Sequence, residues 1–290
     1  MSKTYFVGDH LNDDIFHLNS SLREQTIKYS EEKFNVSIDN YNPWLCYAPV
    51  LNEIPKQFMY HQYNQSIPLI DDDLFIANLA SFMLADGSIA LDELFGENVL
   101  WAPSNSNNTD VYESSVNLIL SSSKSINQLF NKIIDFIIPL GGNINRGYSS
   151  HFARGTIFRS FPKCSNASDM AFFITHELGH NILMLWQSVD PILSSGHSKP
   201  VFSQIRREER PAMQSFHAAF VLSYMLYLEK STASNTEMQE AAIRQGASVN
   251  GTLESALTLA IDSIRKQCFM TEIGNQMLIE MEGIVNLDYR

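Results

Sequence analysis

A histidine–glutamate cluster at helical spacing carries the clearest chemistry in the sequence. Residues 176–180 read His-Glu-Leu-Gly-His, which has the form His-Glu-x-x-His. On a helix, residues four apart project from one face, so His176 and His180 can bind a single cation together. Glu177 is the charged residue of the segment 170–186, and we expect it to be the catalytic carboxylate of the site.

Apolar side chains surround this motif on every face of the helix that we expect over 168–187. A helix that is apolar all round is normally buried. Burying a carboxylate and two imidazoles is costly unless each group has a partner. A divalent metal would offset that cost. A closed hydrogen-bond network of core histidines, without metal, is the alternative.

A metal needs a third protein ligand, and its identity decides the chemistry. Metzincins have Gly and His three and six residues after the second histidine, where this chain has Leu183 and Trp186. Gluzincins have Glu about twenty residues on, where residues 198–202 contain no acid. The next acids beyond that stretch are Glu208 and Glu209.

His217 is the better candidate for the third ligand. It lies in a helix expected over 211–229, on an apolar stripe that would face the first helix. The stripe consists of Met213, His217, Val221, Tyr224 and Leu228. The alternative, His197, belongs to the loop 194–198 and is the weaker candidate.

Three arginines within five residues, Arg206, Arg207 and Arg210, directly precede the second helix. The run can be a solvated charge cluster that pairs internally with Glu208 and Glu209. An arginine at this place can instead present a bidentate fork to a carboxylate near the metal. An enzyme with a dicarboxylate cosubstrate needs such a group, whereas a peptidase does not.

The ordered combination resembles the HExxH-type 2-oxoglutarate-dependent peptide β-hydroxylases, which accompany the biosynthesis of ribosomally made, post-translationally modified peptides. The similarity covers residues 142–224. It rests on the motif at 176–180, Ser203-x-x-Arg206, Arg210-Pro211, His217, and Tyr148-Ser149-Ser150 followed by Gly155-Thr156-Ile157. The chain departs from the family at Gln204-Ile205, where the family has Pro-Trp, and at Ala218, where it has Gly.

The resemblance implies an Fe(II) site formed by His176, His180 and His217 that uses 2-oxoglutarate and O2 to hydroxylate a side-chain β-carbon of a precursor peptide. Arg210, and after it Arg206, would anchor the cosubstrate. Glu177 would then orient the ligands. The alternative is a Zn(II) metallopeptidase in which Glu177 is the general base. A metal-free binding or structural protein is the third possibility.

The pattern predicts an α+β fold that is predominantly helical, with a small central sheet and the metal site between two packed helices. Residues 156–160 are expected to form a strand. Helices are expected over 20–34, 74–84, 125–137, 168–187, 211–229, 236–246, 252–267 and 271–283. The polar stretch 104–110 suggests a helical N-terminal region, 1–110, and a catalytic region, 111–290, or one continuous domain.

Composition excludes several classes of protein. Hydrophobic residues make up 44%, enough for a sizeable core. The net charge of -12 argues against nucleic-acid binding. The first ten residues lack a signal-like apolar run, and residues 218–228 span about half a membrane. Three cysteines without a CxxC pair exclude a zinc ribbon. We expect a cytoplasmic protein without membrane or nucleic-acid partners; its oligomeric state stays open.

Overall fold

The structure, a computed structural model, describes residues 13–35, 37–38, 109–140, 147–151, 154–160, 166–203, 207–232 and 235–287. Helices dominate these ranges, and short strands form three small sheets within them. This agrees with the predicted helical α+β class. No helix among the described residues is long and apolar enough to cross a membrane.

The chain divides into two compact units, each built from separate stretches of sequence. The histidine unit comprises residues 1–15, 114–130 and 166–290, and the sheet unit comprises residues 16–113 and 131–165. The predicted boundary at residue 110 stays a prediction, because residues 39–108 lie outside the described ranges. The predicted helix over 74–84 lies there as well.

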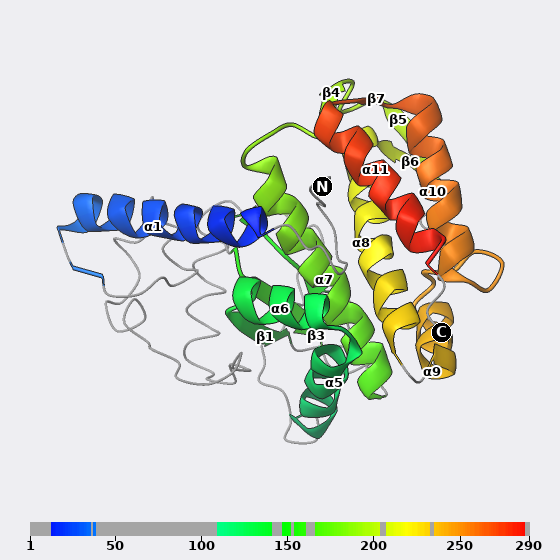
Figure 1. Cartoon of the computed structure of the whole chain (residues 1–290), viewed down its shortest axis with the longest axis horizontal. Helices are drawn as coiled ribbons and strands as arrows, with labels where there is room; N and C mark the ends of the chain where they lie inside the picture. Colours follow the sequence, from blue (N-terminus) through cyan, green and yellow to red (C-terminus); the bar gives the residue numbers. More distant parts are fainter. Residues whose placement is uncertain are drawn as a thin grey trace. The chain divides into compact units, whose positions relative to one another are not determined.

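Helix α8 (Ala212–Ser231) is the central helix of the histidine unit, as Figure 1 shows. It packs against α7 (Ala167–Gln187), α9 (Asn235–Arg244), α10 (Leu253–Gln267) and α11 (Glu272–Val285). Twenty-residue helices bury enough apolar side chain to form a stable core around one central member. All five helices match sequence predictions to within a few residues at each end.

Local contacts explain where the two long helices begin. The side chain of Asn166 accepts a hydrogen bond from the backbone N–H of Asp169 and so caps α7. Helix α8 follows a strand without a side-chain cap. Its first two N–H groups, from Ala212 and Met213, donate to the backbone carbonyls of Lys199 and His197. The connection that precedes α8 therefore satisfies the start of the helix.

The connection between α7 and α8 contributes strands to two short sheets. Strand β4 (Leu193–Ser195) pairs with β7 (Phe269–Met270), and β5 (Pro200–Ser203) pairs antiparallel with β6 (Glu208–Pro211). The sequence predicted none of these strands. Arg210, one of the three clustered arginines, therefore lies in a strand. Helix α8 starts at Ala212, one residue after its predicted start at Pro211.

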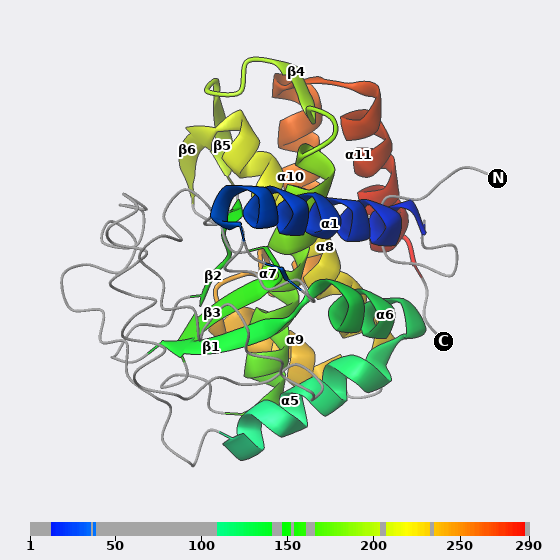
Figure 2. The same ribbon diagram turned by 90° about the vertical axis from the view of Figure 1, so that its left-hand side faces the viewer.

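The sheet unit contains most of α1 (Asp14–Phe34) and a sheet of order β1-β3-β2, best seen in Figure 2. The predicted strand is β3 (Thr156–Ser160). It pairs parallel with β1 (Phe136–Leu140) and antiparallel with β2 (Gly147–Tyr148).

The helix predicted over 125–137 was wrong at its end, because α6 spans Lys124–Ile133. The backbone N–H groups of Asp135 and Phe136 both donate to the carbonyl of Gly155, at 2.7 and 3.1 Å. These two bonds turn the chain out of the helix and start β1. The apolar residues of β1 suit a buried strand as well as a buried helix, so periodicity alone did not distinguish a strand from a helix here. Helix α5 (Thr109–Ser122) was not predicted.

A charge pair joins α1 to the start of β1 in the sheet unit. The guanidinium of Arg23 contacts the carboxylate of Asp135 at 2.7 Å, and both side chains are about three-quarters buried. Burial raises the pKa of Asp135 to about 6, although Arg23 opposes the shift. Gly155 has φ +82°, and a Cβ there would overlap the Asp135 carboxylate. The site therefore requires glycine beside a partly desolvated acid.

This raised pKa predicts that stability falls as the pH rises from about 4 to about 6. The folded state holds the Asp135 proton over that interval more tightly than the unfolded state does. Urea unfolding of wild type and Asp135→Asn across pH 4–7 tests this. The stability of wild type relative to the variant should fall by on the order of 2 kcal/mol. A constant difference between them would contradict the assignment.

Candidate functional site

Helices α7 and α8 pack antiparallel, and three contacts give their register. His180 meets His217, Gly179 faces Val221, and His176 meets Met225. As the residue number falls along α7, that of its partner on α8 rises. The predicted inward stripe of α8 is therefore the face that meets the motif helix.

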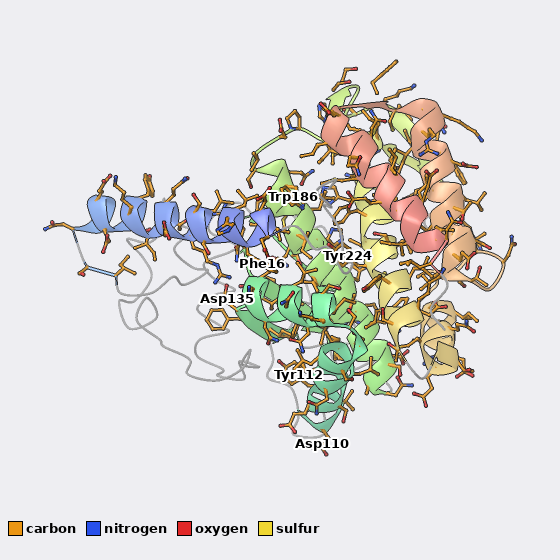
Figure 3. All side chains as sticks on the ribbon, in the orientation of Figure 1. Phe16, Asp110, Tyr112, Asp135, Trp186 and Tyr224 are labelled. Atoms are coloured by element: carbon orange, nitrogen blue, oxygen red, sulfur yellow. The ribbon has the colours of Figure 1, made fainter. Side chains whose placement is uncertain are left out.

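Gly179 allows the two helix backbones to come close. A Cβ atom at this position would lie 3.2 Å from Cα and from Cγ1 of Val221. It would lie 3.5 Å from Cδ2 of Tyr224, a fully buried tyrosine of α8 that is labelled in Figure 3. A side chain larger than hydrogen would push α8 away from α7. The glycine within the motif thus has a packing function besides its place between the histidines.

The three predicted ligand residues lie side by side between these helices. The Nε2 atoms of His176 and His180 are 3.2 Å apart, and the Nδ1 atoms of His180 and His217 are 3.3 Å apart. The ring centroids are separated by 4.9 and 5.5 Å. The structure therefore brings together two imidazoles of the motif and one from the second helix. We call this arrangement the imidazole chain.

The first of these distances suits a shared cation. Two nitrogen ligands of one metal, each bound at about 2.0–2.1 Å, lie roughly 3.0–3.4 Å apart. His217 approaches His180 at its other ring nitrogen, Nδ1. Because His217 contacts this other nitrogen, the three rings do not converge on one point. Accordingly, no group of three or more His, Cys, Asp or Glu side chains among the described residues is arranged as a metal site. The geometry suits His176 and His180 as ligands of one cation and places His217 beside them.

The surroundings keep His180 in its neutral form. Burial lowers the pKa of His180 well below its ordinary value, and the neighbouring His176 and His217 lower it further. Neutral imidazole is the form that binds a metal. Between these helices, a cationic imidazole would be both desolvated and close to two other rings.

Glu177 is buried, with 4% of its surface exposed, as the apolar pattern of α7 predicted. It follows His176 directly on the helix, and its backbone carbonyl accepts a hydrogen bond from the side chain of Asn181 at 3.0 Å. Asn181 is also buried. The carboxylate of the motif and the amide one turn after it are therefore both buried, beside the partly buried His176 and His180.

Arg210 lies half-buried on β6, opposite the fully buried Val201 of β5. Paired residues of neighbouring strands point to the same side of the sheet, so Arg210 shares the inner face with Val201. Its Nε lies 3.6 Å from the carboxylate of Glu208, which is mostly exposed. Arg207 is exposed, and Arg206 lies outside the described residues.

The alternative third ligand, His197, is exposed in the connection between β4 and β5. Its backbone carbonyl accepts a hydrogen bond from the N–H of Met213 near the start of α8. Met225 and Gly179 are contacts of the site that were not predicted from sequence. The antiparallel register identifies both, but that register requires the structure.

Comparison with models of known protein families gave no match. Comparison with curated protein sequences gave no significant match either. The resemblance to the peptide β-hydroxylases therefore remains a hypothesis based on the residues of this chain.

We predict that Gly179→Ala destabilises the protein relative to Gly283→Ala. Both glycines lie in helices, but a Cβ at Gly283 meets nothing within 4 Å. The Gly283 variant should gain about 0.5–1 kcal/mol in helix propensity. The Gly179 variant should lose about 1–3 kcal/mol through overpacking against α8. Urea denaturation measures both, and equal stability of the two variants would contradict the close packing.

Proposed function

We propose that this protein is an Fe(II)- and 2-oxoglutarate-dependent oxygenase that hydroxylates the β-carbon of a side chain in a ribosomally made precursor peptide. The observation that supports this most strongly is the gathering of His176, His180 and His217 between α7 and α8. The order of the motif, the arginine run and the third histidine in the sequence supplies the second argument.

The three histidines would hold the iron. Ligation by three protein side chains on one side leaves positions for a 2-oxo acid and for O2. Bound there, iron with 2-oxoglutarate and O2 supplies the oxidising power needed to attack an unactivated C–H bond. The chain's own contribution is to hold the three imidazoles close together and to keep His180 neutral. His217 would join the cation shared by the other two after a side-chain rotation, because its present contact is with Nδ1 of His180.

Arg210 would bind the far carboxylate of 2-oxoglutarate. It lies two residues before the start of α8, the helix that carries His217, and its guanidinium is partly removed from water. An exposed partner such as Glu208 at 3.6 Å contributes little, so a bidentate carboxylate can replace it. Arg206 is the second candidate for this role.

Glu177 would orient the ligands rather than act on the substrate. A buried carboxylate that adjoins a metal ligand can fix the position of the neighbouring rings and balance the charge of a bound cation. In a zinc peptidase, by contrast, the same residue would have to reach a water molecule on the metal.

The activity test combines iron, ascorbate, O2, 2-oxoglutarate and, as candidate substrates, short peptides encoded in the neighbourhood of its gene. The proposed function predicts succinate release together with a mass gain of one oxygen on the peptide. The matched control omits 2-oxoglutarate. If the complete mixture gives no oxygen addition that depends on 2-oxoglutarate, the proposed function is wrong.

The metal site predicts that Ala at position 176, 180 or 217 abolishes stoichiometric iron binding. Each substitution removes an imidazole that a cation needs, and each leaves the other residues of the helix unchanged. Metal content after anaerobic reconstitution and desalting measures the effect. His197→Ala is the control and should bind iron as wild type does. If His217→Ala keeps full binding while Glu208→Ala loses it, the third ligand has been misassigned.

The cosubstrate site predicts that Arg210→Gln raises the apparent requirement for 2-oxoglutarate tenfold or more. Loss of a charge-assisted contact costs about 1.5–3 kcal/mol, which corresponds to at least a tenfold change in affinity. Iron content should remain that of wild type. Arg207→Gln is the matched control, because its side chain is exposed. An equal effect of the two substitutions would show that Arg210 is not the anchor.

A further inference from the structure

Met225 extends the imidazole chain on the side away from His217. Its Sδ lies 3.3 Å from Nδ1 of His176, and the residue is 3% exposed. Metal-binding histidines usually donate their second ring N–H to a carboxylate, a carbonyl or water. Here the group at this position is a thioether, which belongs to the helix that also carries His217.

A thioether sulfur has no proton to donate and can only accept one. The hydrogen bond between these atoms therefore requires the proton to be on Nδ1 of His176. A neutral imidazole carries one ring proton, so Nε2 of His176 must hold a lone pair. That lone pair points toward the ring of His180, whose Nε2 is 3.2 Å away.

We propose that Met225 is a positioning residue that fixes the Nδ1–H tautomer of His176 and so directs Nε2 to the cation. This rests on the proposed metal site for its purpose, but the tautomer itself does not depend on a bound metal. Without metal, the lone pair on Nε2 of His176 accepts a hydrogen bond from Nε2–H of His180; with metal, the same lone pair binds the cation. His176 thus has the same protonated atom in both states, and metal binding requires no proton movement on this ring.

The register of the two helices explains why α8 can provide both contacts. Met225 lies eight residues beyond His217, and His176 lies four residues before His180. The antiparallel packing beside Gly179 brings each pair together. A shift of α8 along α7 would break both contacts at once. The same packing therefore positions the imidazole of His217 and places Met225 where it can fix the tautomer of His176.

The test compares wild type with Met225→Leu, Met225→Gln and the control Met277→Leu. Leucine keeps the volume and removes the acceptor, whereas glutamine offers a carbonyl acceptor at similar length. Met277 is a buried residue of α11. The first readout is the ring tautomer of His176 in metal-free protein, measured by NMR on ¹⁵N-histidine-labelled samples. The second is the affinity for Co(II) alone, measured by visible absorption.

Wild type, Met277→Leu and Met225→Gln should show the Nδ1–H tautomer of His176. Met225→Leu should lose it in part or whole, and its Co(II) affinity should fall tenfold or more. The proposal is wrong if wild type shows Nε2–H on His176, or if Met225→Leu matches Met277→Leu in the tautomer. A protein with the expected tautomers that binds no metal would contradict the proposed function and leave the assignment of Met225 intact.

Discussion

The close antiparallel contact between α7 and α8 is the constraint on which the candidate site depends. Gly179 has no side chain, so the backbone of α8 at Val221 can approach α7 within van der Waals distance. One helical turn to one side of this contact, His217 meets His180. To the other side, Met225 meets His176. The hydrophobic burial that stabilises the helix pair also determines which ring nitrogens face one another.

The rest of the histidine unit holds α8 in place against α7. Helices α10 and α11 cover other sides of α8, and the connection through β4, β5 and β6 satisfies its first N–H groups. Arg210 lies close to the start of α8 because β6 leads directly into this helix, which carries the third imidazole. The proposed third metal ligand, His217, and the proposed carboxylate anchor, Arg210, thus come from one short stretch of chain.

The long helices and the gathering of the three histidines followed from sequence because 3.6-residue periodicity persists over twenty residues. The strands β4 to β7 did not, since they have only two to four residues, and β4 and β7 also pair across a long sequence separation. Periodicity also failed after Ile133, where Gly155 accepts the bonds that begin β1. The contact of His176 with Met225 spans 49 residues and depends on helix register and rotamers, which no local pattern encodes.

Anaerobic absorption spectroscopy tests the central claim that this site binds iron together with a 2-oxo acid. Addition of 2-oxoglutarate to the Fe(II)-loaded protein should produce a weak charge-transfer band in the visible region, because the cosubstrate chelates the metal. His217→Ala treated in the same way should give none. If wild type gives no band, while the Zn(II)-loaded protein cleaves peptides and Glu177→Gln does not, the site is that of a metallopeptidase.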